Sequence, residues 1–210
     1  MRRRVVGGQN AKIRVAVFGS GMGTNARALL EYSRNKAVAY QIVLIVSNRA
    51  EAGILAVAQQ FGVRNCVLSP RNFATLEEYV TVLHKVLDES AVEFIALAGY
   101  LLKVPATTVQ RYPGRIVNIH PALLPKFGGK GMYGLNVHRA VLDKGEHCTG
   151  ITVHVVTEEY DAGQIIEQVH IPVLLSDTAE SLMQRVQEAE HHYYPRALDR
   201  LCRKLVFPTG

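Results

Sequence analysis

Hydrophobic residues in the first half of the chain form short runs separated by amphipathic stretches. The runs are rich in β-branched residues and end in glycine-rich or polar turns, which is typical of buried strands. The stretches between them repeat apolar residues at helical spacing. We predict strands over residues 13–18, 41–47, 63–68, 93–98 and 115–119, and helices over 24–33, over 51–61 and from Thr75, where Glu78 completes a capping box. This alternation predicts an α/β fold with a doubly wound, mostly parallel sheet.

The second half of the chain has a different pattern. Residues 150–156 and 164–173 are predicted strands joined by a loop that is too short for a crossover helix, so we expect an antiparallel pair. Asp177 and Glu180 are predicted to cap a long final helix, in which apolar residues again recur at helical spacing.

No internal repeat or linker interrupts this pattern. We therefore expect a single domain over residues 11–210, after a loose N-terminal leader formed by residues 1–10. Hydrophobic residues make up 48% of the chain and charged residues 20%, a composition typical of a globular protein rather than a disordered one. The apolar runs are too short to span a bilayer, so we expect no membrane partner.

Charge and cysteine content narrow the choice of partners. The net charge of +6 favours an anionic ligand, but no stripe of Lys and Arg with interleaved aromatic residues indicates nucleic-acid binding. The three cysteines are widely spaced and show no paired metal-ligand spacing. We therefore expect a reducing, cytoplasmic setting, no metal and no nucleic acid. A monomer and a homodimer are both compatible with the sequence.

The most distinctive turn, residues 19–25, follows the first strand and opens the first helix. Its glycines allow close approach of a ligand, and the N–H groups and dipole of the helix start favour an anion. Ser20, Thr24 and Asn25 add side-chain donors. A plain strand-to-helix turn is the alternative. A dinucleotide fingerprint would need glycine at position 24 and a carboxylate after the second strand, and both are missing, so a monophosphate fits better than NAD.

A second group of polar residues follows a later predicted strand. Asn118 and His120 lie at the carboxyl end of that strand and alternate, so both side chains can enter one cleft. An amide can stabilise an oxyanion, and histidine exchanges protons near neutral pH. Asp161, in the loop between the two late strands, is either ordinary turn chemistry or the partner that raises the pKa of His120. Together the three would suit acyl transfer. His154 is either a core residue or a support for this site.

Several segments occur in a defined order: 19–25, 97–100, 118–125, 150–154, 161–163 and 188–191. In this order they resemble the phosphoribosylglycinamide formyltransferase family, from about the first strand to the last helix. The segment Asn-Ile-His-Pro-Ala-Leu-Leu-Pro at 118–125 is characteristic of folate-dependent formyltransferases, and the glycine turn indicates this branch of them. The resemblance implies a Rossmann-like formyltransferase fold.

The resemblance also implies an activity. A formyl group would pass from 10-formyltetrahydrofolate, a reduced folate, to the amine of glycinamide ribonucleotide in de novo purine biosynthesis, without a metal. Asn118 would stabilise the oxyanion. His120 would assist and deliver a proton to the departing folate nitrogen. Asp161 would hold His120 charged.

Binding roles are implied in the same way. The substrate phosphate would bind at Gly23, Thr24 and Asn25, and Glu190 would bind the ribose or the glycinamide end. The folate pterin would lie in a pocket formed by Leu97, Leu101, Val104, Thr157 and Tyr160.

The chain also departs from the family pattern. Leu76 and Leu102 stand where other members often have Arg, which leaves Arg71 or Lys103 to hold the acidic tail of the folate. The loop at 127–134 is long and glycine-rich, and is either a substrate flap or a plain flexible loop. The alternatives are a formyltetrahydrofolate hydrolase, a formyltransferase for another amine such as methionyl-tRNA, and an inactive folate- or nucleotide-binding module. We expect the hydrolase and the tRNA enzyme to need a further domain that 210 residues do not accommodate.

Overall fold

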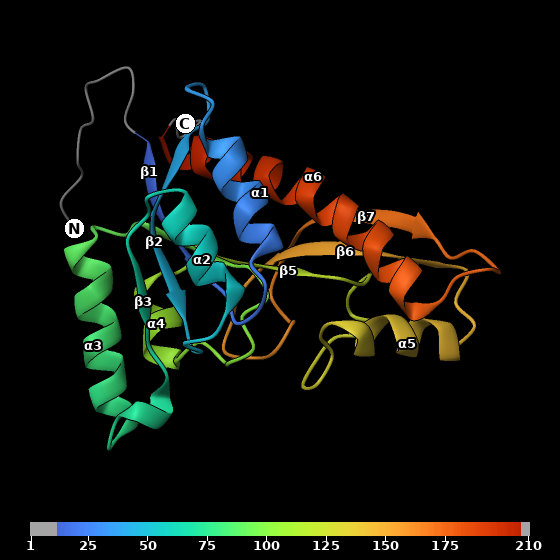
Figure 1. Ribbon diagram of the computed structural model, residues 1–210, viewed down its shortest axis with the longest axis horizontal. Helices are drawn as coiled ribbons and strands as arrows, with labels where there is room; N and C mark the ends of the chain where they lie inside the picture. The colour runs from blue at the N-terminus through green and yellow to red at the C-terminus, as the bar shows by residue number, and fades with distance from the viewer. Residues whose placement is uncertain (1–11, 207–210) are drawn as a thin grey trace.

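The computed structural model describes residues 12–206, and the predicted leader at 1–10 lies outside them (Figure 1). The strands are β1 (Ile13–Phe18), β2 (Tyr40–Ser47), β3 (Asn65–Val67), β4 (Phe94–Leu97), β5 (Ile116–His120), β6 (Cys148–Val155) and β7 (Ile165–Pro172). The helices are α1 (Thr24–Ser33), α2 (Gly53–Gln60), α3 (Leu76–Glu89), α4 (Ala106–Arg111), α5 (Leu135–Asp143) and α6 (Ala179–Val206), with a 3₁₀ turn η1 (Pro70–Asn72).

The strands form one sheet in the order β3-β2-β1-β4-β5-β6-β7. Strands β1 to β5 run parallel, β6 is antiparallel to β5, and β7 is antiparallel to β6. The predicted doubly wound sheet with an antiparallel C-terminal pair is confirmed. The chain moves outward from β1 in one direction to β2 and β3, and then in the other to β4 and β5. This switch opens a crevice at the carboxyl ends of β1 and β4, where α/β sheets bind ligands.

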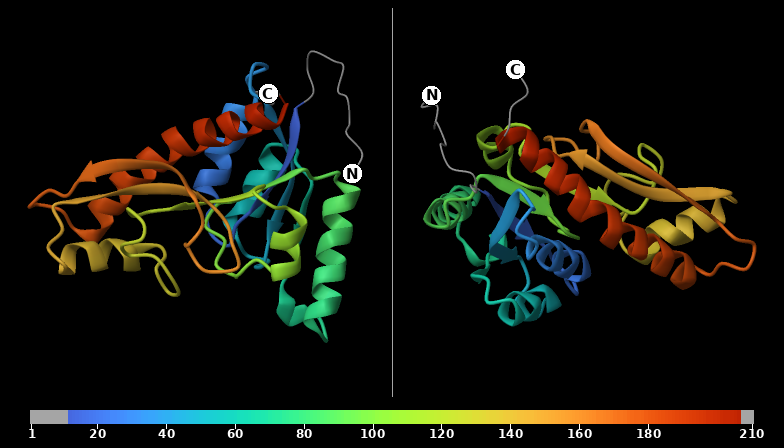
Figure 2. Two further views of the ribbon diagram at one scale, coloured as in Figure 1. Left: turned by 180° about the vertical axis from the view of Figure 1, so that it is seen from behind. Right: turned by 90° about the horizontal axis from the view of Figure 1, so that it is seen from above.

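Alternating side chains divide the core between the two faces of the sheet. Val15 and Val17 point to one face, where α1, α2 and α6 cover the sheet, while Ala16 and Phe18 point to the face that α3 and α4 cover (Figure 2). Because both faces are covered, the parallel strands are almost continuously apolar. The predicted and observed bounds of β1 and α1 agree residue for residue.

Helix capping confirms one prediction and corrects another. Thr75 caps α3, and its hydroxyl accepts the N–H of Glu78 at 3.1 Å, as predicted. The predicted cap of α6 by Asp177 and Glu180 is wrong by one residue. Thr178 caps this helix, and its hydroxyl accepts the N–H of Ser181 at 3.2 Å. The Asp177 carboxylate instead accepts the N–H of Leu174 and pairs with Arg185, so it is already engaged.

Helix α6 is the longest element, with 28 residues, and it continues through Pro195. It packs against α1 and runs along β6 and β7 (Figure 1), so the last helix contacts the first helix of the chain. Within residues 12–206, no helix combines the length and the apolar character that a membrane crossing requires.

Candidate active site

A cavity of about 780 Å³ lies at the carboxyl ends of β1, β4 and β5. Its walls come from the glycine turn before α1, the segment after β4, the glycine-rich loop before α5, the loop after β6 and the N-terminal half of α6. The residues predicted for catalysis, for the nucleotide and for the pterin all line this one cavity: Gly23, Thr24, Asn25, Leu97, Leu101, Val104, Asn118, His120, Thr157, Tyr160, Asp161 and Glu190. Segments that lie up to 167 residues apart in the sequence therefore form a single site.

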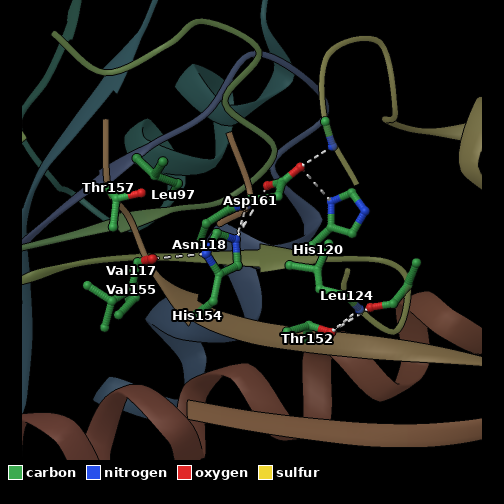
Figure 3. A network of polar contacts seen from close by, with 12 residues as sticks. Leu97, Val117, Asn118, His120, Leu124, Thr152, His154, Val155, Thr157 and Asp161 are labelled. Carbon is green, nitrogen blue, oxygen red and sulfur yellow. Dashed lines mark hydrogen bonds and ion pairs between the residues drawn. The ribbon is translucent and has the colours of Figure 1, made fainter. Parts of the chain in front are cut away.

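The polar centre of the cavity is built on β5 and β6. Asn118 and His120 alternate on β5 and both line the cavity, as their spacing predicts. The antiparallel register between β5 and β6 pairs Asn118 with His154. Figure 3 shows Asp161 between the rings of His120 and His154, approaching both from the loop after β6.

His154 belongs to the site and not only to the core. Its Nδ1 lies 3.0 Å from the carbonyl oxygen of Val155, which can only accept, so Nδ1 carries a hydrogen. Its Nε2 lies 3.2 Å from Nδ2 of Asn118 and 3.4 Å from Oδ1 of Asp161. A neutral ring accepts from Asn118 at Nε2, whereas only a protonated ring can donate to Asp161 there. Protonation of His154 would therefore exchange one partner for the other.

His120 is 4% exposed and lies against Asp161, with 3.8 Å between its Nδ1 and Oδ2 of the carboxylate. Its Nε2 donates to the carbonyl oxygen of Phe127 at 2.7 Å. Burial lowers the pKa of His120, and although Asp161 acts in the opposite direction, burial prevails. The net direction is therefore the reverse of the predicted rise.

The Asp161 carboxylate is held in its ionised form. Burial opposes ionisation, but hydrogen bonds from His154 and from the backbone N–H of Gly129 bring its pKa below the usual value. The N–H of Gly129 donates to Oδ2 at 2.8 Å. Asp161 itself adopts a left-handed backbone conformation with φ of 53°, which is uncommon for a residue other than glycine and is found where surrounding contacts hold it.

The glycine turn presents an uncapped helix start to the cavity. Gly23 has φ of 79°, and a Cβ atom there would lie 2.6 Å from the Cα of Ile54, so only glycine fits. No side chain caps α1, and the N–H groups of its first turn have no partner within the helix. Ser20 also lines the cavity, but its hydroxyl donates to Asn48 and accepts from the N–H of Leu101, so the predicted donor is already engaged within the protein.

Glu190 reaches this turn from α6. Asn25 donates from Nδ2 to Oε2 of Glu190 at 2.9 Å, and Gln187, one turn earlier, donates to the hydroxyl of Thr24 at 2.9 Å. Glu190 is 8% exposed, and burial raises the pKa of its carboxyl to about 7, against the opposing hydrogen bond from Asn25. Oδ1 of Asn25 is buried and has no partner among the described residues, which leaves an acceptor for a ligand.

The opposite end of the cavity is mainly apolar. Leu97 and Val104 are buried in its wall, and Tyr160 is exposed at its rim. Nζ of Lys103 lies 5.6 Å from the centre of the Tyr160 ring and also lines the cavity, whereas Arg71 lies in η1 and is not part of the lining. Of the two cations considered for an acidic ligand tail, Lys103 is therefore the better placed.

Known proteins are similar to this chain in sequence and in fold. Residues 13–198 match the family described as formyl transferase. The chain belongs to this family. It is 40% identical over 198 residues to the chloroplastic phosphoribosylglycinamide formyltransferase of Arabidopsis thaliana, covering 92% of this chain and 66% of that protein. It is 42% identical over 190 residues to the trifunctional purine biosynthetic protein adenosine-3 of Gallus gallus, covering 90% of this chain but 18% of that protein.

Solved structures of the formyl transferase family agree with these matches. The phosphoribosylglycinamide formyltransferase of Brucella melitensis superposes with a TM-score of 0.84 at 40% identity, covering 91% of this chain and 96% of that one. A formyltetrahydrofolate deformylase from Pseudomonas syringae has a TM-score of 0.80 but 22% identity, and therefore shares the fold alone.

One buried cavity residue of this formyl transferase was not predicted from the sequence. His138, on α5, is 2% exposed, and its Nδ1 has no hydrogen-bond partner among the described residues. Burial, together with the nearby His120, lowers its pKa to about 4, so the ring is neutral at physiological pH. It lies between the buried residues Val137 and Val141 on an amphipathic helix, a pattern that by itself indicates only a core position.

The histidines and acids of the site do not form a metal centre. Among residues 12–206, no group of three or more His, Cys, Asp or Glu side chains is arranged to hold a metal ion. The arrangement therefore offers a fixed amide, histidines held by backbone carbonyls and an ionised carboxylate, and these suit proton transfer around an acyl group.

Proposed function

We propose that this protein transfers the formyl group of 10-formyltetrahydrofolate to the amine of glycinamide ribonucleotide, a step of de novo purine biosynthesis. The observation that carries the proposal is a single cavity that joins three features in a formyl transferase. These features are the cluster of Asn118, His120 and Asp161, an uncapped helix start suited to phosphate, and an apolar wall suited to a pterin.

The proposed reaction has two steps at the formyl carbon. The amine of the nucleotide attacks that carbon, and the carbonyl oxygen becomes an oxyanion. Nδ2 of Asn118 carries two hydrogens and only one of them can point to Nε2 of His154, 3.2 Å away, so the other is free to stabilise the oxyanion. The bond between the formyl carbon and the folate nitrogen then breaks, the attacking nitrogen loses a proton and the folate nitrogen gains one. His120, with Asp161 beside its Nδ1, is the group that relays this proton.

Binding roles follow from the two ends of the cavity. The nucleotide phosphate binds at Gly23, Thr24 and Asn25, and Glu190 accepts from the ribose hydroxyls or the glycinamide end. The reduced folate lies against the wall formed by Leu97, Leu101, Val104, Thr157 and Tyr160. The proposed chemistry requires no metal, because the developing charge is stabilised by hydrogen bonds.

The cellular setting is part of the same proposal. Cys66, Cys148 and Cys202 are all free thiols, which fits the reducing environment of the cytoplasm. Both substrates are small molecules, and no nucleic acid or membrane enters the reaction.

The test is a formyl-transfer assay with purified protein. Deformylation of 10-formyltetrahydrofolate is measured with and without glycinamide ribonucleotide, and the formylated product is identified by mass spectrometry. Turnover that depends on the nucleotide is expected. Deformylation that is independent of the nucleotide would indicate a hydrolase. Folate binding without any turnover would indicate another acceptor or a binding module.

The role of His120 is tested by His120→Gln, which keeps a polar side chain but cannot relay a proton. We expect turnover to fall by about 10²- to 10⁴-fold, with folate affinity nearly unchanged. His147→Gln is the matched control, because His147 is exposed at the start of β6 and does not line the cavity. Equal turnover of the two variants would contradict the proposed role.

A further inference from the structure

Ser20 connects two walls of the cavity that are otherwise formed by separate segments. It is 2% exposed and lines the cavity together with the residues of the glycine turn that follow it. Its hydroxyl donates to Oδ1 of Asn48, at the end of β2, and accepts the backbone N–H of Leu101 at 2.9 Å. Its own backbone N–H donates to the carbonyl oxygen of Gly99 at 3.0 Å. One residue is therefore held by three contacts to two neighbouring segments.

The two segments that Ser20 joins serve different ligands under the proposed function. The glycine turn faces the nucleotide phosphate, and Leu101 belongs to the wall for the folate. The segment after β4 is not in regular secondary structure, and Gly99 in it has φ of 71°. Because no helix or strand hydrogen bonds hold this segment, its conformation depends on contacts such as those with Ser20. A shift of Ser20 would move the Leu101 N–H, and a shift of Leu101 would displace the turn, because both hydrogen bonds of the Ser20 hydroxyl are partly buried and costly to break.

We propose that Ser20 is a positioning residue that couples the two substrate subsites, so that a bound nucleotide raises the affinity for the folate and a bound folate raises the affinity for the nucleotide. This inference rests on the proposed function. Because coupling is reciprocal, both affinities change by the same factor, which for coupling through such contacts is about fivefold or more. Asn48 holds the serine hydroxyl in the rotamer that accepts from Leu101, and it thereby takes part in the coupling.

Isothermal titration calorimetry tests the coupling in the full chain. Glycinamide ribonucleotide is titrated with and without saturating tetrahydrofolate, which has no formyl group to transfer. In the wild type we expect the folate to tighten nucleotide binding about fivefold or more. Ser20→Ala should reduce this factor to about one, because the link to Leu101 is lost. Ser90→Ala is the matched control: Ser90 is also buried and hydrogen-bonded, but it caps α3 outside the cavity, so its coupling should equal that of the wild type.

A second measurement needs no variant and covers the case in which Ser20→Ala does not fold. Amide hydrogen exchange at Leu101 in the wild type should slow when the nucleotide alone is bound, because the turn then holds Ser20 in place.

The outcomes separate the two proposals. Independent binding of both ligands to the wild type, or coupling that persists in Ser20→Ala, would refute the coupling and leave the proposed function intact. Failure of the wild type to bind either ligand would refute the proposed function, and the coupling with it. Unchanged exchange at Leu101 on nucleotide binding would also contradict the role of Ser20.

Discussion

The buried carboxyl of Glu190 should make the stability of this protein depend on pH in a way that one substitution removes. Glu190→Gln keeps an oxygen that can accept from Nδ2 of Asn25 but cannot ionise. In the wild type, the pKa of Glu190 is raised from 4.5 to about 7 by burial. Between these two values the native state binds more protons than the unfolded state, so the free energy of unfolding falls as the pH rises.

The magnitude follows from the shift itself. A shift from 4.5 to about 7 corresponds to about 3 kcal/mol, at 1.36 kcal/mol for each pKa unit. The free energy of unfolding of Glu190→Gln minus that of the wild type should therefore rise by about 3 kcal/mol between about pH 4 and about pH 8, and level off above the native pKa. Other titrating groups cancel in this difference, because they are common to both proteins.

The assay is urea denaturation of the ligand-free protein at several pH values, followed by circular dichroism. Glu188→Gln is the matched control for the loss of one carboxylate, because Glu188 lies on the same helix but is exposed and does not line the cavity. Parallel stability curves for the wild type and Glu190→Gln would refute the reasoning, and would mean that Glu190 ionises in the native state as easily as in the unfolded chain.

Two further substitutions test other parts of the structure. Thr75→Ala should lower the free energy of unfolding by about 1 kcal/mol in the same denaturation assay, because it removes the cap of α3. Thr75→Ser keeps the hydroxyl and should retain most of this free energy. A loss of similar size in both variants would show that the hydroxyl is not what stabilises the helix. His154→Phe should lower turnover about 100-fold. It should also move the acidic limb of the pH-rate profile to higher pH, because the hydrogen bond of His154 to Asp161 lowers the pKa of that carboxyl. An unshifted profile would show that His154 does not set the pKa of Asp161 in the reaction.

Local patterns predicted the elements because their causes are local. The apolar run at β1 and the helical spacing of α1 depend on residues within a few positions, and the capping of α3 depends on two residues three apart. The cap of α6 was misplaced because three candidate capping residues stand together, and the tertiary contact of Asp177 with Arg185 decides among them. Helices α4 and α5 were not predicted, since both are short and follow irregular, Pro- or Gly-containing segments.

The sequence by itself determined the fold class, the carboxyl-end position of Asn118 and His120, and their alternation toward one cleft, because strand periodicity sets which side chains share a face. The tertiary structure alone decided which distant groups meet them. The β5-β6 register brings His154 to Asn118, and the return of α6 brings Glu190 to Asn25, 165 residues away in the sequence. It also decided the charge states, because the burial that lowers the pKa of His120 and raises that of Glu190 arises only when these segments pack together.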